Sequence, residues 1–202
     1  AQRGTESIRN EGSTLSTDRL NDYQSPFAGT GKALSISANR ISYAFNLTGP
    51  SLAIDTACSS AMYAMHNAIN ALRRGECSAA LVGGVNVMLD PSTFSAFNAA
   101  GMLSKSDGKV KFGDNTADGY ARGEGCGVVV LKRISQAERS TGLIYATVIG
   151  SAVNQDGRSN GLTAPNPASQ EAVLKAAYVD AQVSPSEVAY VEAHGTGTKL
   201  GD

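Results

Sequence analysis

A cysteine within a run of small polar residues is the first candidate catalytic group in this sequence. Cys58 lies in the stretch IDTACSS, after a short apolar run at residues 51–54 and before apolar residues at helical spacing. This order predicts a strand-to-helix corner, where the free N–H groups of the first helical turn and the helix dipole favour thiolate over thiol. Because the thiolate is the nucleophilic form, Cys58 is a candidate for covalent catalysis.

Position alone leaves two interpretations of Cys58 open. The predicted corner resembles a nucleophile elbow with sulfur in place of oxygen, and its neighbours Ala57, Ser59 and Ser60 are small enough to let a substrate approach. A cysteine among alanine and serine is, however, more often a small buried side chain without any chemistry. Only further features of the sequence can decide between the two.

The second candidate is a histidine near the end of the sequence. His194 follows an apolar run at residues 188–191 and begins the motif HGTGT, whose glycines would let a ligand come close. The hydroxyls of Thr196 and Thr198 can donate and accept hydrogen bonds, to a ligand or only within the turn. His194 itself has the alternative of bonding only its own loop.

Composition and charge argue against several classes of protein. The 202 residues are 42% hydrophobic, enough for a domain with a core, and the net charge of −1 without a basic run argues against nucleic acid. No apolar run approaches the ~20 residues of a membrane span. The three cysteines lack C-x-x-C spacing and fit neither a disulfide framework nor a zinc site, so we expect no metal and a reducing, cytoplasmic setting. The sequence begins with Ala1 and ends on a Gly-rich motif at Asp202, which leads us to expect a fragment.

Periodicity and punctuation predict the elements that position these groups. Residues 51–82 predict strand, helix and strand in succession, a βαβ unit with a parallel sheet. His66 lies on this helix about two turns from Cys58 and is interpreted as structural. The glycines at 83–84 and 123–127 are interpreted as close packing against a sheet. Residues 1–30 are expected to be surface loop. The other expected elements are helices at 32–45, from 90, at 135–141, 168–182 and from 184, and strands at 128–131, 143–153 and 188–191.

Five blocks, in this order, resemble the β-ketoacyl synthases. The likeness is greatest to ketosynthase domains of multidomain polyketide synthases and animal-type fatty acid synthases. It runs from about residue 49 to the end and is thinner before that point. The blocks are GPSLAIDTACSS (49–60), ALVGGVN (80–86), ADGYARGEG (117–125), SAVNQDGRSNGLTAPN (151–166) and VEAHGTGT (191–198).

The resemblance implies a thiolase-like fold, an α/β fold layered αβαβα, which we expect to be incomplete here. It implies the N-terminal half of a ketosynthase domain over residues 1–134, with its start truncated, and the beginning of a C-terminal half over 143–202. The family forms homodimers. Its second active-site histidine and a lysine lie in a block beyond HGTGT, so we expect the 202-residue piece by itself to be inactive.

The resemblance also implies decarboxylative Claisen condensation, in polyketide or fatty acid biosynthesis. Cys58 would carry the growing acyl chain as a thioester, a task for a group that is both nucleophile and leaving group. His194 would bind and activate a malonyl-type extender, and Thr196 and Thr198 would contact the phosphopantetheine arm of an acyl carrier protein. No cofactor would bind directly. The implied partners are the acyl carrier protein, an adjacent acyltransferase and other synthase domains of the parent chain.

Three rival functions stay open beside condensation. The first is a non-condensing relative that binds acyl chains or supports a dimer, against which the intact Cys58 argues. The second is a thiolase or chalcone-type enzyme using coenzyme A, from which the HGTGT and ADGYARGEG blocks differ. The third is a cysteine hydrolase in which Glu192, on the same strand face as His194, orients the imidazole.

Overall fold

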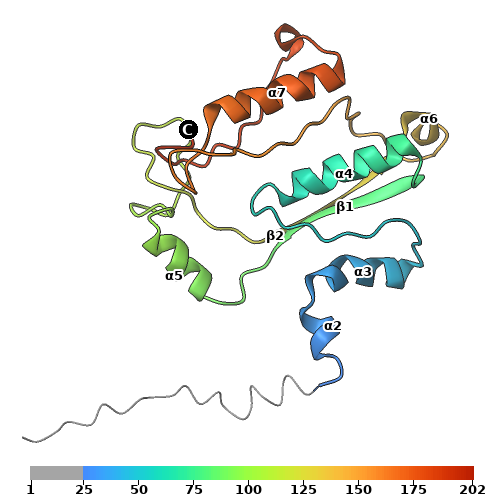
Figure 1. The fold of residues 1–202 in the computed structure, drawn as a ribbon, viewed down its shortest axis with the longest axis horizontal. Coiled ribbons are helices and arrows are strands. Elements are labelled where there is room, and N and C mark those ends of the chain that lie inside the picture. The colour runs from blue at the N-terminus through green and yellow to red at the C-terminus, as the bar shows by residue number, and fades with distance from the viewer. Residues whose placement is uncertain (1–24) are drawn as a thin grey trace, which may run out of the picture. The chain divides into compact units, whose positions relative to one another are not determined.

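The computed structural model describes residues 25–202, drawn in colour in Figure 1. The chain divides into two compact units, Ala1–Ala53 and Ile54–Asp202. In the first, α2 (Ala28–Lys32) precedes α3 (Leu34–Phe45). Asn46 ends α3 with a left-handed φ of 53°, close to the end that the sequence predicts. The loop expected at residues 1–30 lies mostly outside the described residues.

Helix α4 (Ser60–Arg74) is the element on which the second unit is built. Ile69 and Leu72 of its apolar stripe are buried, whereas Met62, expected on the same stripe, is 64% exposed. Gly75 ends the helix with a φ of 75°, and two arginines place positive charge in the last turn, where the helix dipole is negative. The predicted helix after Cys58 is confirmed.

Strands β1 (Ala79–Asn86) and β2 (Gly125–Lys132) form an antiparallel pair beside α4 (Figure 1). The predicted βαβ unit with a parallel sheet is wrong, because β1 pairs with a strand some forty residues later rather than with residues 51–54. Val82 is buried, and a Cβ on Gly84 would lie 3.0 Å from the Cβ of Ala61 in α4. Close packing therefore explains Gly84, but no such neighbour lies near the glycines of β2.

Apolar side chains also lie on the sheet face opposite Val82. Strict alternation along a strand sends them to that face, and they are 47–70% exposed: Leu81, Val85, Val128 and Val130. The buried apolar residues of the described chain are Ile69, Leu72 and Val82. Within Ile54–Asp202, α4 thus packs against the sheet face that carries Val82, whereas the apolar side chains of the opposite face are exposed.

Three further predicted strands, at residues 51–54, 143–153 and 188–191, have no regular secondary structure here. A strand exists only through hydrogen bonds to a neighbour, and in the described part of the chain β1 and β2 pair with each other. The apolar patterns mark segments suited to a sheet, but they do not contain the partner.

The other helices follow their local signals. They are α5 (Ser92–Ala99), α6 (Ile134–Ala137), α7 (Pro167–Ala181) and the 3₁₀ turn η1 (Pro185–Glu187). Asn166 caps α7 by accepting from the N–H of Ala168, and Ser184 with Glu187 forms a capping box at η1. The guanidinium of Arg122 lies 5.8 and 4.8 Å from the ring centroids of Phe94 and Phe97, which are both on α5.

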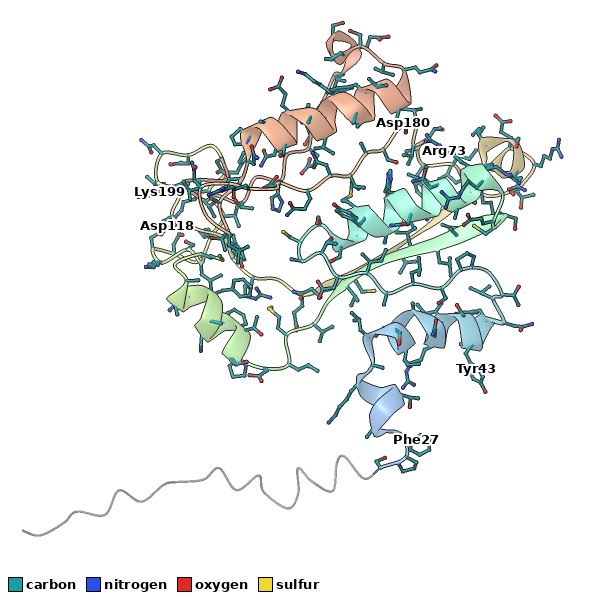
Figure 2. All side chains as sticks on the ribbon, in the orientation of Figure 1. Phe27, Tyr43, Arg73, Asp118, Asp180 and Lys199 are labelled. Carbon is teal, nitrogen blue, oxygen red and sulfur yellow. The ribbon has the colours of Figure 1, made fainter. Side chains whose placement is uncertain are left out.

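Polar contacts join α4 to residues 149–154 and to α7. Arg73 forms an ion pair of 2.8 Å with Asp180, and the two side chains face each other between the helices in Figure 2. Asp180 also accepts from the N–H of Ser151 at 2.8 Å. Helix α4 therefore has the sheet on one side and residues 149–154 on another (Figure 1).

The Arg73–Asp180 contact predicts an acid-sensitive stability. The Arg73 guanidinium, aided by the Ser151 N–H, holds the pKa of Asp180 below its ordinary value. Such a carboxylate stabilises the fold above the unfolded pKa, about 3.9, and this contribution is lost as the pH falls through the lower folded pKa. We expect the free energy of unfolding, from urea titrations, to fall from about pH 5 downwards, and Asp180→Asn to weaken that dependence.

Glu171→Gln is the matched control, because Glu171 lies on the same helix and pairs with Lys175, where the two side chains are 65% and 73% exposed. Exposed pairs of this kind contribute little to stability. Equal pH dependence in Asp180→Asn and the unaltered chain would contradict the assignment.

Candidate active site

Cys58 lies on the turn that leads into α4, two residues before the helix begins at Ser60, and its side chain is exposed. Ala57 before it has a φ of 57°, in the left-handed region that a Cβ disfavours. Such strain persists only where the surroundings fix the backbone. The predicted corner at the helix start is present, although the run before it is not a strand.

Side chains of the same motif fix this turn. Asp55 accepts from the N–H of Ala57 at 3.0 Å. Ser60 Oγ accepts from the N–H of Thr56 at 2.9 Å and donates to the carbonyl of Ala57 at 2.6 Å, while Ser59 Oγ donates to the carbonyl of Thr56 at 2.9 Å. Sequence reasoning noted only the small size of Ser59 and Ser60 and did not single out Asp55. Their short polar side chains, which compete for backbone groups just before a helix, were the available signal.

Two side chains of α4 reach the block SAVNQDGRSNGLTAPN. The hydroxyl of Tyr63 donates to the carbonyl of Asn154. His66 Nδ1 lies 2.9 Å from Ser151 Oγ, and its Nε2 lies 3.0 Å from Asn70 Nδ2. Both ring nitrogens thus have partners, and the Nδ1 contact joins α4 to Ser151, which agrees with the structural role expected of His66.

The HGTGT motif forms an irregular loop in which His194 is exposed. The Thr196 and Thr198 hydroxyls lie 2.9 Å apart, and Thr198 also accepts from the N–H of Gly201 at 3.1 Å, so both serve the turn. Gly197 has a φ of 70° and is buried, and a Cβ there would lie 2.9 Å from the backbone nitrogen of Lys111. Glycine is required at this point by both conformation and close approach.

Residues 102–120, between α5 and β2, support this loop. The N–H of Gly119 donates to the carbonyl of Gly197 at 2.9 Å, and a Cβ on Gly195 would lie 3.0 Å from the Phe112 ring. Asp202 accepts from the N–H of Gly197 at 3.0 Å. Sequence reasoning did not identify this support. In Figure 2 the labelled Asp118 and Lys199, one from each segment, lie near each other.

Asp118 organises the supporting loop. Its carboxylate accepts from Ser104 Oγ and the Ser106 N–H, both at 2.9 Å, and lies 3.0 Å from Lys111 Nζ. Hydrogen bonds from Lys111 and Ser104 hold the pKa of Asp118 far below its ordinary value, and Asp107 and Asp118 raise the pKa of Lys111. Sequence reasoning did not single out Asp118, because its partners are 7 to 14 residues away.

Cys58 and His194 lie in the same compact unit. Within residues 25–202 no hydrogen bond joins their side chains, and their meeting across one cavity stays a prediction. Glu192, the orienting carboxylate of the hydrolase hypothesis, accepts from the hydroxyl of Tyr190 instead. The geometry therefore lends the hydrolase hypothesis no support.

The described residues contain no gathering of three or more His, Cys, Asp or Glu side chains that could hold a metal ion. A bilayer-crossing helix is likewise not found among residues 25–202, since none there combines the necessary length and apolar character. Cys58, Cys77 and Cys126 are all free thiols.

Two domain families match consecutive parts of the chain. Residues 4–137 match the β-ketoacyl synthase N-terminal domain, and residues 145–202 match the β-ketoacyl synthase C-terminal domain. Among characterised proteins, the chain is 56% identical over 176 residues to a phenolphthiocerol/phthiocerol polyketide synthase protein of Mycobacterium tuberculosis. It is 50% identical over 176 residues to the pikromycin polyketide synthase component PikAII of Streptomyces venezuelae.

These alignments take in 87% of this chain but 9% and 5% of the two synthases, so the chain spans less than a tenth of their length. The solved ketosynthase from module 6 of the bacillaene synthase of Bacillus subtilis is 47% identical with a TM-score of 0.82, over 86% of this chain and 31% of that one. The oxazolomycin ketosynthase domain KS7 from Streptomyces albus gives a TM-score of 0.82 at 42% identity, over 84% of this chain and 29% of that one. The fold is accordingly part of the thiolase-like αβαβα architecture, and the chain belongs to the β-ketoacyl synthase family.

Proposed function

We propose that the chain is part of a condensing ketosynthase in polyketide biosynthesis, in which Cys58 accepts the acyl chain and His194 binds the extender. The observation that carries the proposal is an exposed thiol on a turn fixed by its own motif, at the start of a helix held on two sides. Relatives at 50–56% identity that are named as polyketide synthases support the substrate class.

In the proposed first step, the Cys58 thiolate attacks the carbonyl carbon of a carrier-bound acyl thioester. A C–S bond to Cys58 forms, and the oxyanion collapses to expel the pantetheine thiolate, which takes up a proton. The backbone N–H of Cys58, at the start of α4, is a donor suited to that oxyanion. Because the Cys58 side chain is exposed, it can accept an acyl chain from a separate carrier protein.

In the second step, a malonyl-type thioester loses CO₂ and leaves an enolate. His194 would donate a hydrogen bond to the enolate oxygen. The enolate carbon attacks the Cys58 thioester, forming the new C–C bond and releasing the Cys58 thiolate. Thr196 and Thr198 would exchange their mutual hydrogen bond for contacts to the pantetheine arm. No bound cofactor is needed for either step.

The proposal extends to setting and partners. We assign residues 1–134 to an N-terminal half and residues 143–202 to the start of a C-terminal half of one ketosynthase domain, acting as a homodimer beside acyltransferase and other synthase domains. The uncovered sheet face and the 31% coverage of the bacillaene ketosynthase support a larger domain. Three free cysteines support a reducing, cytoplasmic setting.

Replacing the nucleophile tests the first step. In the synthase that carries these residues, Cys58→Ala should abolish acyl loading and lower condensation by about a thousandfold or more, because it removes the thiol that is proposed to form the thioester. Intact-protein mass after incubation with an acyl thioester measures loading. Cys126→Ser is the matched control, since Cys126 is also exposed but lies in β2. Loading that persists in Cys58→Ala would refute the assignment.

Replacing the histidine separates the two steps. His194→Ala should leave loading of Cys58 within about twofold and slow decarboxylative condensation about 10²- to 10³-fold, the usual effect of removing one oxyanion donor. Release of labelled CO₂ from malonyl carrier protein measures the second step. His66→Asn is the control, because His66 holds α4 and should affect both steps alike. A wild-type protein that loads acyl groups but never condenses would favour a non-condensing acyl-binding domain.

The 202-residue polypeptide by itself should not condense. Its sheet exposes Val85 at 70% and Val130 at 62%, a surface that a working domain would cover. We expect strong binding of a hydrophobic fluorophore such as ANS and no product from acyl and malonyl carrier substrates. Turnover by the isolated polypeptide would contradict this expectation.

A further inference from the structure

We propose that Asp118 is a positioning residue: its carboxylate shapes residues 102–120 into the surface on which the His194 loop rests. The inference depends on the proposed function, because it assigns to Asp118 a part in condensation and none in acyl loading. It concerns how the two candidate groups are held, since the Cys58 turn and the His194 loop are supported by different parts of the chain.

The carboxylate of Asp118 gathers both ends of the supporting loop. One oxygen accepts from Ser104 Oγ at 2.9 Å and lies 3.0 Å from Lys111 Nζ. The other accepts from the N–H groups of Lys105 at 3.1 Å and Ser106 at 2.9 Å. The Asp118 and Lys111 side chains are 27% and 18% exposed, so water competes only partly for these contacts.

The Asp118–Lys111 contact joins the two backbone segments, at residues 110–111 and 119, that lie against Gly197. The N–H of Gly119, the next residue, donates to the carbonyl of Gly197 at 2.9 Å. A Cβ on Gly197 would lie 2.9 Å from the backbone nitrogen of Lys111 and 3.1 Å from the carbonyl oxygen of Gly119. The Asp118–Lys111 contact thus fixes both walls of the slot that holds Gly197, three residues after His194.

The Cys58 turn does not use this slot. Its hydrogen bonds come from its own motif, through Asp55, Ser59 and Ser60. Loosening residues 102–120 should therefore displace the imidazole of His194 while leaving the thiol where it is. A shift of about 1 Å in a positioned group is enough to cost about a hundredfold in rate.

The test compares Asp118→Asn with Asp107→Asn in the complete synthase. Asp107 is the matched control, because it also contacts Lys111, at 2.9 Å, but its other bonds stay within its own turn, to Ser106 and Lys109. Acyl loading is followed by intact-protein mass, and condensation by product formation from malonyl carrier protein. Asp118→Asn should load Cys58 within about twofold of wild type and condense about 10- to 100-fold more slowly. Asp107→Asn should keep both rates.

Gly197→Ala probes the same slot from the other side. Its methyl group would clash with the backbone nitrogen of Lys111. The variant should therefore load Cys58 normally and condense more slowly, as Asp118→Asn should. Parallel loss of both steps in Asp118→Asn and Gly197→Ala would mean a general role in folding and would overturn the inference. Unchanged condensation in Asp118→Asn would also overturn it. A wild-type synthase that loads but does not condense would instead overturn the proposed function, and this inference with it.

Discussion

The fixing of α4 on two sides is the constraint on which the rest of the unit depends. On the sheet side, Gly84 admits the Cβ of Ala61, and Ile69 and Leu72 are buried. On the other side, His66 and Arg73 bind residues 149–154 and α7. A helix packed in this way cannot rotate about its axis without breaking contacts on both sides, so the direction in which its first turn points is set.

The two candidate groups are held by different kinds of contact. The Cys58 turn closes through hydrogen bonds over two to four residues, so it can form as soon as the helix does. The His194 loop depends on partners about eighty residues earlier, at Phe112 and Gly119. Ordering such a long-range contact carries a larger loop-closure cost, which makes the histidine side of the site the more sensitive to changes elsewhere in the chain.

Sequence patterns predicted what depends on neighbours along the chain. The end of α3, the range of α7 and the start of η1 all follow from residues close by in the sequence. The prediction of which strands pair was wrong, because nothing within residues 51–54 or 188–191 encodes whether a partner strand lies beside them. The candidate residues Cys58 and His194 were chosen by type and motif, whereas Asp55 and Asp118 were missed because their roles appear only once distant or backbone partners are placed.

The left-handed alanine before the thiol has a consequence for protein engineering. A φ of 57° costs an L-residue about 1–2 kcal/mol relative to helical backbone, and glycine would adopt it freely. A search for heat-resistant variants would therefore be drawn to glycine at position 57. The same exchange would remove the methyl group that restricts the backbone of residue 57. The Cys58 thiol would then be held less firmly in its orientation, even though the folded state had become more stable.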